Sequence, residues 1–155
     1  MSVSRADGNQ SDVVIVDKCE LMRNTIKSMI LSHKYDVYEA IDEIGALSLT
    51  IRHNPKIIFI SMEGNQFWPG LVQCIKKNRN CTIVAYSTGI TREIVANAYF
   101  AGVDDILVNP QNQKERIEKY ITTLENKNPE RYYRFPSKKS EGFSSIKKFF
   151  WLQAE

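Results

Sequence analysis

Four apolar stretches of this chain are each followed by a polar residue whose side chain could take part in chemistry. The stretches are residues 13–16, 57–60, 82–86 and 106–108, and the polar residues that follow them are Asp17, Ser61, Ser87 and Asn109. Short apolar runs of this kind are typical of strands buried on both faces of a parallel sheet. Because the carboxyl ends of parallel strands meet at one edge of the sheet, we expect these four side chains to converge there.

Helical segments alternate with these strands. Helices are predicted from about residue 20 to 34, at 42–53, around 71–75, at 91–101 and at 113–125, with a half-exposed strand at 35–40 and a loop at 64–70. The buried face of the first helix is predicted to hold Leu21, Ile26, Met29 and Ile30. Five alternations of strand and helix predict an α/β fold, a doubly wound five-stranded parallel sheet with five helices on its two faces.

Several helix ends carry recognisable signals. Asp42 is suited to cap the second helix, and the pair Asn54 and Pro55 should stop it. Thr91 should begin the fourth helix, and Gly102 should end it in a left-handed conformation.

The charge distribution separates the chain into a neutral domain and a basic end. Residues 1–126 contain 14 Lys and Arg against 15 Asp and Glu, whereas residues 127–155 contain 7 against 3. We expect a flexible leader at 1–11, one domain at 12–126 and a basic, aromatic extension at 127–155. A neutral domain argues against electrostatic binding of nucleic acid, and the extension is too short for an ordinary DNA-binding module.

The three cysteines and the hydropathy pattern indicate the compartment. Cys19, Cys74 and Cys81 lack close paired spacing, which favours free thiols in a reducing cytoplasm over disulfides or a zinc site. The N-terminus has no signal-peptide pattern, and no apolar run approaches the length of about 18 residues that a membrane span needs. We therefore expect a soluble cytoplasmic protein.

Several chemistries of α/β folds do not match the residues around Asp17. A phosphatase loop needs a cysteine and an arginine separated by five residues, but Cys19 and Arg23 are only four apart. A hydrolase with an aspartate nucleophile needs an acid at position 19, and a cobalamin module needs a histidine there. A flavin-type phosphate loop needs a turn rich in Ser, Thr and Gly after the first strand, and residues 17–20 are not one.

The same segments, residues 13–18, 55–61, 82–88 and above all the run 101–110, resemble the receiver domain of bacterial response regulators (CheY-like). The resemblance covers residues 12–126 and implies a flavodoxin-like sheet with strand order 2-1-3-4-5. In that family the first strand ends in an acidic pair, the third in the phosphorylated aspartate, the fourth in Ser or Thr, and the fifth in Lys-Pro with a cis peptide. The resemblance makes Asp17 the first acid, Ser87 the hydroxyl and Pro110 the proline.

Three positions depart from the family pattern. Lys18 stands in place of the second acid, Ser61 in place of the phosphorylated aspartate, and Asn109 in place of the lysine. Magnesium prefers carboxylate and phosphate oxygens, so an ammonium group at position 18 should repel it, and we predict neither a metal nor another cofactor. One interpretation is that Lys18 fills the vacated metal position and pairs with Asp17. Glu63 is the only nearby acid that could restore a metal ligand, and the simpler interpretation is an incidental, solvated loop residue.

The output face of the family lies on the fourth helix, the fifth strand and the fifth helix. The strand residue there is usually an aromatic switch, and in this chain it is Ile106. Tyr86, Tyr99 and Phe100 are aromatic residues nearby, for which packing in the core is the simplest interpretation. We expect another signalling protein to bind this face through Ile106 and Tyr99.

The extension at 127–155 ends in a potential short helix with an aromatic stripe. Ser144 or Ser145 can cap it, and Phe149, Phe150 and Trp151 lie beside Lys147 and Lys148. Three hypotheses remain open: packing on the domain or on a second copy in a homodimer, docking to a partner protein, and contact with a membrane or nucleic acid.

Together, these features predict a degenerate, stand-alone receiver-like protein that is not an enzyme. It would act in two-component signal transduction by protein–protein interaction without phosphorylation. One alternative is an active receiver with unusual phosphorylation at Ser61. The other is a regulator that binds a small ligand in the vacated cleft.

Overall fold

The computed structural model describes residues 12–30, 35–64 and 68–125. The leader at 1–11 and the extension at 127–155, with Phe149, Phe150 and Trp151, lie outside the described residues. Within the described part, no helix is both long and apolar enough to span a membrane.

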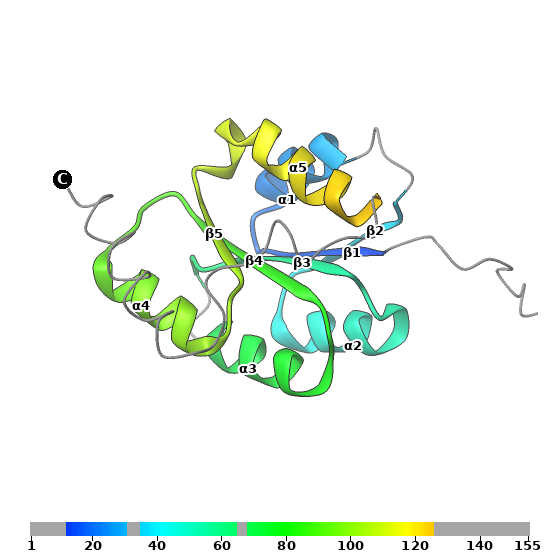
Figure 1. The fold of residues 1–155 in the computed structure, drawn as a ribbon, viewed down its shortest axis with the longest axis horizontal. Helices are drawn as coiled ribbons and strands as arrows, with labels where there is room; N and C mark the ends of the chain where they lie inside the picture. Colours follow the sequence, from blue (N-terminus) through cyan, green and yellow to red (C-terminus); the bar gives the residue numbers. More distant parts are fainter. Residues whose placement is uncertain (1–11, 31–34, 65–67, 126–155) are drawn as a thin grey trace, which may run out of the picture.

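The fold is a three-layer arrangement around one parallel sheet (Figure 1). Its strands are β1 (Val13–Val16), β2 (Val37–Ala40), β3 (Ile57–Ser61), β4 (Thr82–Ser87) and β5 (Asp105–Val108), in the spatial order β2-β1-β3-β4-β5. The helices are α1 (Glu20–Ile30), α2 (Glu43–His53), α3 (Trp68–Asn78), α4 (Arg92–Ala101) and α5 (Lys114–Glu125), with a short 3-10 helix η1 (Pro110–Asn112). The predicted fold class and strand order are confirmed.

The two faces of the sheet are closed by different helices. Figure 1 shows α1 and α5 on one face and α2, α3 and α4 on the other. Alternate strand residues point to opposite faces, so Ile15 and Phe59 pack with α1 and α5, while Ile58 and Ile60 pack with the other three helices. All five residues of β3 are buried, as expected for the central strand of a parallel sheet.

The predicted caps are present. The Asp42 carboxylate accepts a hydrogen bond of 2.7 Å from the Gly45 amide, and the Thr91 hydroxyl accepts one of 3.2 Å from Ile94. Asn54 and Gly102 both have left-handed backbones, with φ of 47° and 108°, at the ends of α2 and α4. Helix boundaries set by local side-chain chemistry were therefore predictable.

Two details of the helices differ from the prediction. Leu21 is 76% exposed, whereas Ile26, Met29 and Ile30 are buried. Leu21 is five residues before Ile26, which places it roughly 140° away around the helix. Residues 68–70, predicted as loop, form the first turn of α3, where Pro69 is tolerated because its missing N–H has no partner within the helix.

Candidate functional site

The strand register brings the four predicted residues to one edge of the sheet. Val16 is opposite Ile60, so Asp17 and Ser61, the residues that follow them, lie side by side on β1 and β3. Ser61 is in turn opposite Tyr86 on β4. The amide of Asn109 donates a hydrogen bond of 2.9 Å to the Ser87 carbonyl, which joins the ends of β4 and β5.

The Asp17 carboxylate is buried and has protein donors on both oxygens. The Tyr86 hydroxyl donates to Oδ2 at 2.7 Å, and the Cys19 amide donates to Oδ1 at 2.8 Å. Burial and then the bond to Asp17 raise the pKa of Tyr86 far above its ordinary value, so the phenol stays a donor. The sequence analysis assigned Tyr86 only to the core, because nothing in its local pattern reveals a partner 69 residues away.

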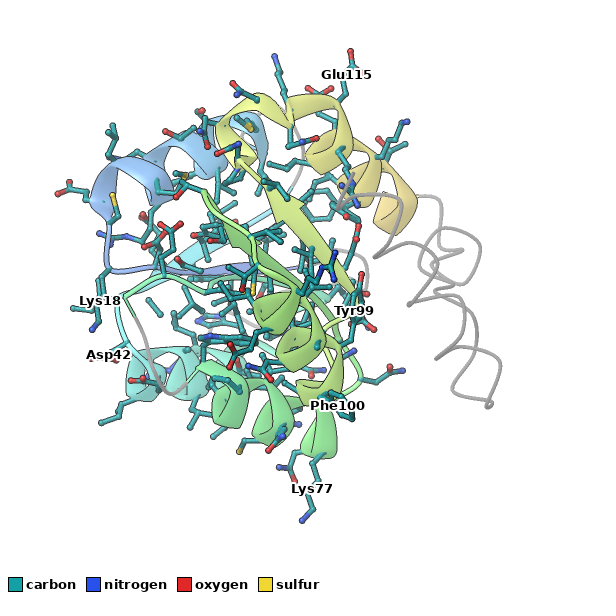
Figure 2. All side chains as sticks on the ribbon, turned by 90° about the vertical axis from the view of Figure 1, so that its left-hand side faces the viewer. Lys18, Asp42, Lys77, Tyr99, Phe100 and Glu115 are labelled. Carbon is teal, nitrogen blue, oxygen red and sulfur yellow. The ribbon has the colours of Figure 1, made fainter. Side chains whose placement is uncertain are left out.

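Lys18 does not fill the predicted position. Its side chain is exposed and projects from the periphery of the molecule in Figure 2, and no ion pair joins it to Asp17 among the described contacts. The cation nearest to the backbone of this turn is Arg23, which donates to the carbonyl oxygens of Asp17 at 2.7 Å and Lys18 at 3.2 Å. The suggested pairing of Lys18 with Asp17 is therefore absent from the described contacts, in which Tyr86 and Cys19 each donate one hydrogen bond to the carboxylate.

The donor set at this edge does not fit the magnesium ion that the family resemblance implies. Among the described residues, Asp17 directly follows β1 and accepts one hydrogen bond on each oxygen, while the Glu63 carboxylate in the loop after β3 is bonded to Ser87 and Thr88. In the part of the chain that the structure describes, no three His, Cys, Asp or Glu side chains are grouped closely enough to hold a metal. One carboxylate beside a serine hydroxyl is a poor match for the near-octahedral oxygen coordination that magnesium requires.

Ser61 is 6% exposed, and its hydroxyl is engaged within its own turn. The Ser61 Oγ accepts a hydrogen bond of 3.2 Å from the Glu63 amide and lies 3.5 Å from the Glu63 carbonyl oxygen. Serine hydroxyls commonly stabilise turns in this way. Ser61 therefore positions the backbone of Glu63.

Glu63 makes hydrogen bonds across the edge that its sequence context did not indicate. Its Oε1 accepts hydrogen bonds from the Thr88 amide at 2.6 Å, from the Ser87 hydroxyl at 2.9 Å and from the Thr88 hydroxyl. The bond from the Thr88 hydroxyl is the largest cause that lowers the pKa of Glu63 below its ordinary value. Glu63 is exposed, as predicted, but it is bonded across the edge instead of being incidental.

Asn109 and Pro110 differ from the family geometry. Asn109 is half-buried with a left-handed backbone, φ 50° and ψ 67°, a conformation that asparagine tolerates better than most residues. There is no cis peptide bond among the described residues, so the bond before Pro110 is trans, contrary to what the resemblance implied. The left-handed Asn109 turns the chain directly into η1.

The face formed by α4, β5 and α5 contains a hollow of about 140 Å³. Its lining includes Ile90, Val95, Tyr99, Ile106 and Arg116. Ile106 is only 8% exposed and belongs mainly to the core. It therefore lies at the bottom of the hollow and offers little surface to a partner. Figure 2 looks onto this side of the molecule, with Tyr99 and Phe100 labelled.

A buried carboxylate holds α5 against β5 beneath this face. Asp105 accepts hydrogen bonds from Arg116 at 2.9 and 2.8 Å, from the Ile106 amide at 2.8 Å and from the Tyr120 hydroxyl. Burial raises the pKa of Asp105, and the guanidinium of Arg116 opposes that effect. The sequence analysis missed this cluster, although the spacing of Arg116 and Tyr120 by four residues on one helix face was visible.

Comparisons with known proteins support the fold. No family model and no curated protein matches the chain. A signal receiver domain of an HD domain-containing protein from Pseudomonas fluorescens Pf-5 is 19% identical, with a TM-score of 0.70 over 84% of this chain and 98% of that one. A two-component response regulator from Clostridium difficile is 20% identical, with a TM-score of 0.67 over 77% and 99%.

A third solved structure, a response regulator from Thermotoga maritima, is 19% identical, with a TM-score of 0.65 over 73% of this chain and 98% of that one. These solved structures are receiver domains and response regulators, and each is covered almost completely. The chain therefore has the fold of response-regulator receiver domains, as the sequence resemblance implied.

Proposed function

We propose that this receiver fold serves signal transduction by protein–protein contact and without phosphorylation at its carboxyl edge. The observation that carries the proposal is the state of Asp17, whose two oxygens are both bonded to the protein itself. A receiver needs an acceptor carboxylate on β3 beside acids that hold magnesium. Here β3 ends in Ser61, and Lys18 adds an exposed cation next to Asp17.

Phosphorylation of Ser61 is the competing function, and its environment argues against it. The hydroxyl is buried and accepts a hydrogen bond from the Glu63 amide. A serine nucleophile needs a neighbouring base to take its proton. Among the described residues, the contacts of Ser61 supply no such base, since both go to the backbone of Glu63.

Incubation of the full chain with Mg²⁺ and acetyl phosphate tests the proposal. Intact mass spectrometry should show an unchanged mass, because β3 ends in Ser61 instead of an aspartate and the Asp17 carboxylate is buried. A receiver domain with the usual aspartate, treated in parallel, should gain about 80 Da, the mass of one phosphoryl group. The same gain on this chain would overturn the proposal, and peptide mapping would show whether Ser61 carries the group.

The partner-binding face that we propose is formed by α4, β5 and α5. Phe100 is 72% exposed on α4, and the hollow beside Tyr99 offers a place for an apolar side chain of the partner. Tyr99 lines the hollow and is half-buried, whereas Phe100 is exposed outside it, and aromatic residues of either kind are common interface anchors. A stable contact at this face does not depend on any change at Asp17.

Affinity capture with three matched variants tests this face. Phe100→Ala and Tyr99→Ala should reduce capture of the bound partner at least about tenfold, the usual effect of losing an interface anchor. Ile51→Ala is the control, because Ile51 is 67% exposed on α2, away from α4, β5 and α5. Equal capture by all three variants would direct attention to residues 127–155, which a deletion variant would test.

A further inference from the structure

The ends of β3 and β4 form a donor set that suits an anion. Two hydroxyl groups, of Ser87 and Thr88, and the Thr88 amide all approach one oxygen of Glu63. The Gly89 amide adds a further favourable interaction with the same carboxylate. Clustered N–H and O–H donors of this kind bind oxoanions such as phosphate, sulfate and carboxylate.

From these contacts we propose that residues 87–89 form an oxoanion-binding site whose resident ligand is the chain's own Glu63 carboxylate. The protein thereby excludes external oxoanions of the phosphate class from its carboxyl edge. The biological meaning of this closed site rests on the proposed function, in which the edge stays in one state without phosphorylation.

Glu63 is held in place from both ends. At its backbone, the amide donates to Ser61 Oγ at 3.2 Å, and Gly64 follows with a left-handed φ of 68° that turns the chain. At its side chain, the Thr88 amide and hydroxyl donate to Oε1. An intramolecular ligand fixed in this way has a high effective concentration, so a dissolved anion competes poorly with it.

The Ser87 hydroxyl divides its one hydrogen between Glu63 and the backbone of its own loop. It has one hydrogen and two acceptors within reach, Glu63 Oε1 at 2.9 Å and the Gly89 carbonyl at 2.7 Å. Its oxygen also lies 3.3 Å from the Gly89 amide. Thr88 is therefore the principal donor, and Ser87 shapes the loop that presents it.

Inorganic phosphate is the probe for the experiment. The full-length wild-type chain, Glu63→Ala and Glu115→Ala are titrated with phosphate at constant ionic strength, and amide resonances are followed by NMR. Glu115 is an exposed acid on α5, so its variant changes the net charge equally without touching residues 87–89. We expect saturable shifts of the Thr88 and Gly89 amides in Glu63→Ala and none in the wild type or in Glu115→Ala.

Two outcomes would overturn the inference. One is an equal response of the wild type and Glu63→Ala, which would mean that the carboxylate does not occupy the donors. The other is a folded Glu63→Ala that shows no saturable response. A covalent mass gain with acetyl phosphate would instead refute the proposed function, so the two failures are distinguishable.

A measurement on the wild type keeps the inference testable if Glu63→Ala does not fold. Carbon-13 NMR of the side-chain carboxyl group follows the titration of Glu63 directly. The titration should lie below the ordinary value of 4.5, because the donors favour the charged form. A titration at or above that value would show that Thr88 does not hold the carboxylate in solution.

Discussion

The Tyr86 hydroxyl and the Asp17 carboxylate form a buried pair at the carboxyl edge. Tyr86 is 2% exposed and Asp17 is 7% exposed, so water cannot replace a lost partner easily. Leaving a buried acceptor without its donor usually costs more than the hydrogen bond itself contributes. This pair therefore stabilises the fold at a place where the family resemblance leads one to expect chemistry.

Tyr86→Phe should lower the free energy of unfolding by about 1–3 kcal/mol, because Asp17 Oδ2 loses its donor while the ring still fills the core. Urea denaturation at neutral pH measures the change. Tyr38→Phe is the matched control, since Tyr38 contributes a ring stacked 3.7 Å from that of His53, and phenylalanine retains this ring. Indistinguishable effects of the two substitutions would contradict the buried hydrogen bond.

Glu63 gives the fold a defined dependence on pH. Its pKa is lowered in the folded protein, so its stabilising contribution is present above 4.5 and is lost as the pH falls through the folded value. Glu63→Gln should therefore be less stable than the wild type at pH 7, by less than about 1 kcal/mol because solvent screens an exposed carboxylate. The difference should disappear at low pH.

Urea denaturation of both proteins at a series of pH values measures this dependence. The wild type and Glu63→Gln should converge as the pH falls below 4.5. A difference that stays constant over the whole range would show that Glu63 acts by its size or shape and not by its charge.

For individual residues, the sequence predicted the position of a side chain in the fold better than its hydrogen-bond partners. Asp17, Ser61, Ser87 and Asn109 could be assigned to one edge because strand ends are marked by local apolar runs. Tyr86 and Glu63 could not be assigned their partners, because both bonds join separate strands and depend on side-chain directions. The same limit applies to the suggested pairing of Lys18 with Asp17.

The contact between β5 and α5 depends on a charged cluster beneath the proposed binding face. Arg116, with a side chain 37% exposed, donates two hydrogen bonds to Asp105, which is 11% exposed. Removing the charged partner of a largely buried carboxylate is costly, although solvent at Arg116 reduces the effect. The cluster fixes the position of α5 beside the hollow.

Arg116→Met should therefore lower the free energy of unfolding by about 1–3 kcal/mol, as Asp105 keeps only its neutral donors. Lys114→Met is the control, because Lys114 lies 3.9 Å from Glu118 in an exposed pair whose loss costs at most about 0.5 kcal/mol. Chemical denaturation of the two variants compares them. A small and equal loss would mean that Arg116 does not support α5.

Elements were largely predictable because each carries its own signal. Asp42, Thr91 and Gly102 mark helix ends through local hydrogen bonds or a permitted backbone conformation. The start of α3 was misjudged because residues 68–70 contain proline and glycine, which usually indicate a loop. Trp68, the first residue of α3, is buried in the core, and this packing outweighs the weak helix preference of proline and glycine.

At the scale of the whole molecule, the described residues form two core clusters, one on each face of the sheet. Both core clusters are made of residues between Val13 and Ile121, and each face of the sheet has its own helices. The overall fold could be predicted because alternating strands and helices leave few compatible topologies. The role of residues 127–155 stays a prediction, because composition alone does not determine a binding partner.

A chain ending at residue 126 should fold cooperatively, with a melting temperature within about 4 °C of the full chain, because it retains both described core clusters. Thermal unfolding followed by circular dichroism measures this. Light scattering measures the mass of both proteins in solution and so shows whether the extension joins two copies of the chain. A larger decrease in melting temperature would instead show that the extension packs on the domain.

The hydrogen bond between Tyr86 and Asp17 also bears on whether a single substitution could turn this edge into a phosphorylated receiver site. An aspartate placed at position 61 restores an acceptor, yet Asp17 still faces the Tyr86 hydroxyl and Thr88 still holds Glu63. We therefore expect that Ser61→Asp alone does not turn this edge into a phosphorylated receiver site, because the neighbouring groups at the ends of β1 and β4 keep their present hydrogen bonds.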